Sequence, residues 1–274
     1  IGMASAIKLA EKGMSVCIVY RERRTAAKKT EDFYDTLRSE GKSILSFNIN
    51  ALEEEGRKTV IDELKSRLAK ENGKIRLLLH SIARGNLKLL APLKNETEKI
   101  QNELLANGIN PEKYPLPAKL DHDVLLKEDD YALTIQAMAT SLLSWANSLR
   151  TNELFADDAR IVGLTSEGNK KAWKSYGAVS AAKVVLESLA RSMAVELAPY
   201  GIRTNIIQAG ITDTPSLRMI PGSKDIVANA IIRNPFHRLT KPEDIANVVY
   251  LLSTDEAAWI NGSIINVDGG EQIA

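Results

Sequence analysis

A tyrosine and a lysine that share one face of a predicted helix stand in the second half of the chain. Lys183 follows Tyr176 after six intervening residues, in a stretch whose small apolar residues recur at helical spacing. Advancing seven residues along an α-helix turns the chain through about 700° and lifts it by about 10 Å, so both side chains lie on one face. The pattern predicts a cleft into which a phenol and an ammonium both point. The alternative is a surface tyrosine beside a solvated lysine.

The elements that must position this pair alternate regularly along the chain. Short β-branched runs without alternation predict strands that are buried on both faces, at 15–20, 43–47, 75–79, 160–164, 203–207 and 263–267. Amphipathic stretches predict helices at 4–12, 25–40, 51–70, 131–149, 225–233 and 242–252, the last with Thr240 as its N-cap, and a long helix that begins near Tyr176. This alternation indicates an α/β fold with a doubly wound, mostly parallel sheet and helices on both faces, in which ligands bind beyond the carboxyl ends of the strands.

Composition restricts the class of protein. The chain has 274 residues, 44% of them hydrophobic and 26% charged, with a formal net charge of +1, so nothing favours a nucleic-acid or membrane partner. The single cysteine, Cys17, lies in an apolar run and is expected to be buried, and no apolar stretch reaches the ~18 residues that span a bilayer. We therefore expect one domain in a cytoplasmic protein, and no metal site.

Basic residues follow the first predicted strand. Arg21, Arg23 and Arg24 stand where a dinucleotide-binding fold that prefers NAD usually places an acidic side chain, and arginines there accommodate a 2′-phosphate. The cluster therefore favours NADPH, with solvated surface charge as the alternative. Gly2, directly before the first helix, is interpreted as the remainder of a phosphate-binding turn. Because the chain opens on this glycine, we expect residues upstream of Ile1 that supply a central strand.

The other strand ends also carry candidate cofactor contacts. Asn48 and Ile49 are expected to border the adenine, and the small residues around Ser81, Ile82 and Ala83 to let the backbone approach the cofactor. His80 beside them is more typical of a structural histidine than of a catalytic one. After the strand at 203–207, the backbone and hydroxyls around Gly210, Ile211 and Thr214 suit a carboxamide and a pyrophosphate.

The regular alternation is interrupted between about residues 86 and 130. This segment contains Pro92, Pro111, Pro115 and Pro117, an amphipathic piece at 95–106 and a polar stretch with His122. A long interruption inside a compact domain is usually functional, and a solvated surface excursion is the alternative.

Together these residues resemble the short-chain dehydrogenase/reductase family, except at about 86–130. Ordinary carbonyl-reducing members carry Tyr-x-x-x-Lys, but here the fourth residue after Tyr176 is Ser180. The Tyr-x6-Lys spacing is similar to that of the enoyl-acyl-carrier-protein reductase branch, as are the stretches that begin at His80 and Gln136. Many of these reductases have a second tyrosine ten residues before the first, where this chain has Ser166 beside Thr165.

The resemblance implies NADPH-dependent reduction of the C2=C3 bond of a trans-2-enoyl thioester, on acyl carrier protein or coenzyme A, in fatty-acid synthesis. It implies Tyr176 as donor to the enolate oxygen and Ser166, less so Thr165, as an added hydrogen bond or proton relay. Lys183 would bind the cofactor ribose and favour ionised Tyr176 by its charge. Thr214 and the backbone of Ile211 would hold the carboxamide.

Two other functions remain open at this stage. One is a carbonyl reductase or alcohol dehydrogenase of the same fold, against which the absence of Tyr-x-x-x-Lys argues. The other is a non-catalytic NADP-binding scaffold, against which the retention of Tyr176 and Lys183 argues. The resemblance also implies a homotetramer built through the helices that begin near Tyr131 and Tyr176.

Overall fold

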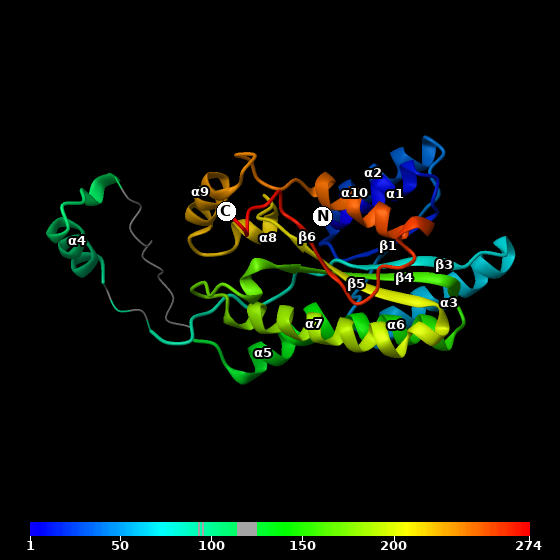
Figure 1. Ribbon diagram of the computed structural model, residues 1–274. Coiled ribbons are helices and arrows are strands. Elements are labelled where there is room, and N and C mark those ends of the chain that lie inside the picture. Colours follow the sequence, from blue (N-terminus) through cyan, green and yellow to red (C-terminus); the bar gives the residue numbers. More distant parts are fainter. Residues whose placement is uncertain (93, 95, 114–124) are drawn as a thin grey trace.

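The computed structural model describes residues 1–92, 94, 96–113 and 125–274, in which helices pack around parallel strands (Figure 1). The strands are β1 (Val16–Tyr20), β2 (Ile44–Asn48), β3 (Ile75–His80), β4 (Phe155–Ser166), β5 (Ile202–Ala209) and β6 (Ile264–Val267). The α-helices are α1 (Gly2–Glu11), α2 (Arg24–Ser39), α3 (Glu54–Glu71), α4 (Thr97–Ala106), α5 (Glu128–Ile135), α6 (Ser141–Thr151), α7 (Gly177–Glu196), α8 (Pro215–Arg218), α9 (Ser223–Arg233) and α10 (Pro242–Ser253). The predicted α/β class with parallel strands is confirmed.

The strands form two hydrogen-bonded groups. β1 pairs with β2, and the second group has the order β3-β4-β5-β6, with every pair parallel. Among the described residues no hydrogen bonds join β1 to β3, so the predicted parallel sheet is present as these two groups of strands. β4 and β5 share the longest register, from Ala159 opposite Ile202 to Ser166 opposite Ala209.

Helices cover both faces of the sheet, as Figure 1 shows. Successive side chains of a strand point to opposite faces, and β4 illustrates this. Ile161 packs into the cluster formed with α6 and α7, whereas Val162 and Leu164 pack with α1 and α10. α3 joins α6 on the first face, and α2 covers β1 and β2 on the second. The site residues thus stand on a sheet that is held from both sides.

The predicted elements are present, with boundaries that differ by a few residues. The helix predicted at 131–149 is divided into α5 and α6 by a π-helical turn, Gln136–Thr140. α10 begins at Pro242, but its N-cap is Lys241, whose backbone N–H donates to Asp244, because Thr240 instead bridges to Thr212. The expected burial of Cys17 is also wrong, because this side chain is exposed.

The segment at 86–130 departs from the rest of the fold and rejoins it at the same place. Leu126 N–H donates to Leu89 O (2.8 Å), and Lys88 Nζ lies 2.7 Å from Asp130 Oδ1. Beyond this base, α4 stands away from the sheet and contributes no buried side chain (Figure 1). Residues 93, 95 and 114–124, with Pro115, Pro117 and His122, lie outside the described residues.

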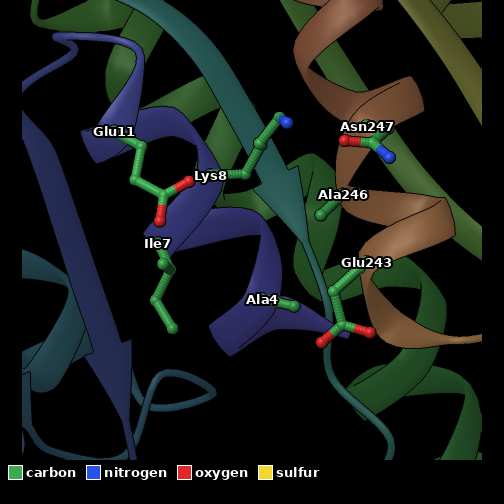
Figure 2. A pocket seen from close by; sticks show the side chains of 7 residues that line it. All are labelled: Ala4, Ile7, Lys8, Glu11, Glu243, Ala246 and Asn247. Atoms are coloured by element: carbon green, nitrogen blue, oxygen red, sulfur yellow. The ribbon is translucent and has the colours of Figure 1, made fainter.

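α1 and α10 lie side by side on one face of the sheet. Figure 2 shows the shallow surface pocket between them, about 180 Å³, which is lined by residues that include Lys8 and Glu11 of α1 and Glu243 and Asn247 of α10. In the part of the chain that the structure describes, no helix is both long enough and apolar enough to cross a membrane.

Candidate active site

The end of β4 and the beginning of α7 bring two hydroxyl groups together. Ser166 is the last residue of β4, and Tyr176 directly precedes α7. Their oxygens, Ser166 Oγ and Tyr176 Oη, lie 3.3 Å apart. Tyr176 is 7% exposed, and the ring of Trp173 meets it edge-on with centroids 5.1 Å apart. Burial raises the pKa of Tyr176, partly offset by the contact with Ser166, so the phenol is a protonated donor at neutral pH.

Lys183 lies two turns further along α7 and is buried. Its Nζ donates to the carbonyl oxygen of Leu164 in β4, at 2.7 Å. Burial lowers the pKa of Lys183 to about 8, and the carboxylate of Glu187 on the same helix works in the opposite direction. The amine of Lys183 is thus held against β4 two residues before Ser166, whose hydroxyl contacts Tyr176.

Thr165 points to the other side of β4 from Ser166. Its hydroxyl donates to Glu187 Oε1 at 2.6 Å, and the same carboxylate oxygen accepts from the amide of Asn169. Strand alternation separates adjacent residues in this way, so of the two hydroxyls predicted for the site only Ser166 contacts Tyr176. Thr165 instead holds the carboxylate that adjoins Lys183, and its one hydroxyl proton is used there.

The start of α1 adjoins the residues that follow β3, so Gly2 lies beside Ser81. A Cβ on Gly2 would lie 3.0 Å from Ser81 Oγ, so only a glycine fits without displacing that side chain. Ser81 and Ala83 are exposed, and Ile82 packs against the cluster that contains Tyr176. The loop after β3 therefore contacts the start of α1 through Ser81 and the cluster that contains Tyr176 through Ile82.

The three arginines after β1 are exposed. Arg23 is the N-cap of α2, and Arg24 is its first residue. Within the described ranges none of Arg21, Arg23 and Arg24 forms an ion pair, so their guanidinium donors remain free for an anionic ligand.

The backbone and amide groups predicted to contact a cofactor are already used within the protein. Asn48 Oδ1 accepts from the backbone N–H of Glu22 (2.9 Å), and its amide donates to the Glu22 carbonyl (3.2 Å). The N–H of Ile49 donates to Tyr20 O at 2.9 Å. Asn48 thus fixes the turn that carries the arginines, a role that the sequence pattern did not indicate.

The loop after β5 is fixed in the same way. The N–H of Ile211 donates to Glu271 Oε2 at 3.1 Å, and its carbonyl accepts from Thr240. Thr214 caps α8 by accepting from the backbone of Leu217 (3.2 Å). A Cβ on Gly210 would lie 2.9 Å from Asp268 Cα, so glycine is required where this loop meets the chain after β6.

Two features of the site escaped the sequence analysis. His80 Nε2 lies 2.7 Å from Ser141 Oγ, which itself donates to Ala137 O, so the imidazole donates as a neutral ring. Burial lowers the pKa of His80 to about 4, and the charge of Lys183 adds to this effect. This confirms a structural histidine, but its partner stands sixty-one residues away in the sequence. The second feature is a buried ion cluster that adjoins Ser166, described below.

The chain belongs to the short-chain dehydrogenase/reductase family, an oxidoreductase family, and residues 117–272 match the model described as Enoyl-(Acyl carrier protein) reductase. Similar solved structures include the enoyl-acyl carrier protein reductase of Bacillus cereus with NADP+ and indole naphthyridinone. It is 24% identical, with a TM-score of 0.77, over 99% of this chain and 91% of that one. The enoyl-[acyl-carrier-protein] reductase (NADH) of Aquifex aeolicus is 21% identical, with a TM-score of 0.73 and the same coverage. These likenesses show the fold.

Two sequence relatives are named for different kinds of reaction, one for a dehydrogenation and one for a reduction. The cis-4-hydroxycyclohexanecarboxylate dehydrogenase of Sinomonas cyclohexanicum is 27% identical over 98% of this chain and 91% of its own length. The 1-cyclohexenylcarbonyl-CoA reductase of Streptomyces collinus is 33% identical over 44% of each chain. The second match spans less than half of that relative, so it bears on a part of the protein only.

Proposed function

We propose that this protein reduces the C2=C3 bond of a trans-2-enoyl thioester with NADPH, in fatty-acid synthesis. The observation that carries the proposal is the buried Tyr176 hydroxyl, 3.3 Å from Ser166 Oγ, with Lys183 seven residues later in α7, the helix that Tyr176 precedes. That spacing is the one by which the sequence resembles enoyl reductases rather than carbonyl reductases. The match to the family model supports the same branch.

The residues present fit a nicotinamide dinucleotide at both of its ends. Gly2 leaves room beside Ser81 that a Cβ would fill, and the first turn of α1 offers backbone N–H groups to a diphosphate. The free guanidinium groups of Arg21 and Arg24 suit a 2′-phosphate, which distinguishes NADPH from NADH. Lys183 would donate to the nicotinamide ribose. Bound there, the cofactor supplies the hydride.

Within this site the chain's own residues act on the thioester oxygen. Reduction of the conjugated double bond moves negative charge onto that oxygen, which then needs a donor in a site that excludes water. Tyr176 supplies the O–H, and Ser166 orients it or returns a proton to it. Trp173 packs on the ring of Tyr176, Ile82 packs against the same cluster, and the ring is only 7% exposed to water. The charge of Lys183 stabilises a tyrosinate that has given up its proton.

The named relatives are compatible with this reaction class. The Streptomyces collinus enzyme is named for 1-cyclohexenylcarbonyl-CoA, a thioester whose double bond adjoins the carbonyl group. The Sinomonas cyclohexanicum enzyme is a dehydrogenase that matches along nearly the whole chain. Oxidation of a hydroxy acid, or reduction of the corresponding ketone, is therefore the second candidate function.

The first test compares these reactions directly. Purified protein is assayed by NADPH absorbance with a short trans-2-enoyl-CoA, with a cyclic ketone, and with NADH in place of NADPH. Tyr176→Phe should lower kcat for the enoyl thioester by about a hundredfold or more with NADPH binding retained, the cost of one oxyanion donor. Tyr200→Phe, an exposed tyrosine, is the matched control. Turnover of the ketone alone would replace the proposal by the second candidate, and unchanged turnover in Tyr176→Phe would refute the role of Tyr176.

The cofactor preference has its own test. Arg21→Ala combined with Arg24→Ala should narrow the preference for NADPH over NADH by about tenfold or more, since each removes a charge-assisted contact to the phosphate. Lys28→Ala combined with Lys29→Ala removes the same amount of positive charge from exposed positions of α2. This control should leave the preference for NADPH over NADH unchanged. If both double variants change the ratio equally, the phosphate is bound elsewhere.

We also propose that the protein assembles as a homotetramer through α5 and α7. Leu133 of α5 and Val184 and Val195 of α7 are 58%, 48% and 75% exposed, an apolar surface of the kind that subunit interfaces cover. Sedimentation velocity measures this state directly, and a monomer would refute the proposal.

A further inference from the structure

A buried ion cluster of Glu167, Arg233 and Glu271 lies beside the candidate active site. Arg233 Nη2 lies 2.8 Å from Glu167 Oε1 and 3.0 Å from Glu271 Oε1, so one guanidinium joins the two carboxylates. The carboxylate side chains are 6% and 1% exposed. Lys171 also reaches Glu167, with Nζ 2.8 Å from Oε2.

The cluster joins three segments that are far apart in the sequence. Glu167 begins the short turn after β4, Arg233 ends α9, and Glu271 follows β6 near the carboxyl end of the chain. Glu271 uses its second oxygen, Oε2, to accept from the N–H of Ile211 in the loop after β5. The carboxyl-terminal segment is further held by Asn234, whose amide donates to Asp268 O at 2.8 Å. Each carboxylate therefore has a partner that compensates for its burial.

Glu167 stands between two residues that both contact Tyr176. On one side is Ser166, whose Oγ lies 3.3 Å from the phenol oxygen. On the other is Gly168, where a Cβ would lie 2.5 Å from Cε1 of the Tyr176 ring. The side chain of Glu167 thus fixes the backbone on both sides of it. That backbone positions the Ser166 hydroxyl and places Gly168 against the ring of Tyr176.

We propose that Glu271 is a positioning residue that acts through Arg233 and Glu167 to hold the Ser166 hydroxyl against Tyr176. This proposal rests on the proposed function for its effect on turnover. Without the negative charge of Glu271, Arg233 has a single carboxylate to bind, and the turn at Glu167 loses its link to the chain after β6. The Ser166 hydroxyl then loses its alignment with the phenol, and a misplacement of about 1 Å at such a group costs up to about a hundredfold in rate.

The test is a double-mutant cycle with Ser166. Glu271→Gln keeps the size of the side chain and an acceptor for the Ile211 N–H but removes the charge. We expect it to lower kcat for the enoyl thioester about tenfold while KM for NADPH changes by less than about twofold. In the Ser166→Ala background the same change should have no further effect on kcat. Glu63→Gln, at an exposed position of α3, is the matched control in both backgrounds.

A second readout does not depend on turnover. Protein labelled with 3-fluorotyrosine gives ¹⁹F resonances, and that of Tyr176 is assigned by its absence in Tyr176→Phe. Its titration should show a higher phenol pKa in Glu271→Gln, because contact with Ser166 lowers the pKa of Tyr176, and no further rise when Ser166 is already alanine. A pKa that Glu271→Gln leaves unchanged, or an equal loss of kcat in both Ser166 backgrounds, would overturn the proposal. If the titration behaves as expected and no enoyl thioester is reduced, the positioning role stands and the proposed function fails.

Discussion

Asp158 pairs with three arginines at the end of the sheet opposite the candidate site, and its replacement by asparagine should destabilise the fold measurably. Its carboxylate binds Arg160 and Arg203, and Arg76 Nη1 lies 2.9 Å from it. Arg160, 1% exposed, also donates to the carbonyl of Leu252 at the end of α10 (3.1 Å). Asp158→Asn would leave three guanidinium groups crowded without their common anion.

The magnitude follows from the exposure of the carboxylate. A partly exposed ion pair contributes about 0.5–1 kcal/mol, and breaking a fully buried one costs about 3–5 kcal/mol. The Asp158 side chain is 36% exposed and has three such partners. We therefore expect a loss of about 2–3 kcal/mol in the free energy of unfolding, or a Tm lower by about 5–10 °C for a chain of this size. Urea unfolding followed by circular dichroism measures it, with the exposed neighbour Asp157→Asn as the control.

The pH dependence provides a stricter check. Hydrogen bonding to Arg160 lowers the pKa of Asp158 against the opposing effect of burial, and the charges of Arg76 and Arg203 add to the lowering. A group whose pKa is lowered on folding stabilises the folded state above its unfolded pKa of about 3.9 and loses that contribution as the pH falls through the folded pKa. The difference in the free energy of unfolding between wild type and Asp158→Asn should have its full value at pH 7 and decrease below about pH 4. A difference that is unchanged in acid, or that Asp157→Asn reproduces, would refute the electrostatic explanation.

Two further predictions concern stability. His80, whose pKa burial lowers to about 4, stays neutral in the folded protein while the unfolded chain takes up a proton below about pH 6.5. The free energy of unfolding of the wild type should therefore fall by on the order of 2–3 kcal/mol between pH 6.5 and pH 4. His80→Asn should lack this pH-dependent loss. His237→Asn, at an exposed position, should retain it. Gly201 has φ 71°, and a Cβ there would lie 1.8 Å from Asp157 O. Gly201→Ala should lower the free energy of unfolding by at least about 2 kcal/mol more than Gly13→Ala, because Gly13 has φ 85° but open space where a Cβ would lie. Equal Tm values in the two variants would contradict this.

The sequence by itself determined the alternation of strands and helices and the pair at the centre of the candidate site. Hydrophobic periodicity is a local property, so β4, β5 and α7 could be predicted to within a few residues, except that β4 extends beyond the predicted 160–164 at both ends. The seven-residue step from Tyr176 to Lys183 is also local, although Tyr176 is the N-cap of α7 and not one of its helical residues.

Only the tertiary structure decided which groups meet across the chain. Thr165 and Ser166 are both candidates in the sequence, with Ser166 preferred, and the structure shows that Thr165 bonds to Glu187 while Ser166 contacts Tyr176. The backbone of Ile211 and the cluster at Arg233 are fixed by a carboxyl-terminal glutamate that no local pattern links to them. Such contacts depend on where strands are placed in the sheet, which is set by the packing of the whole molecule rather than by spacing along the chain.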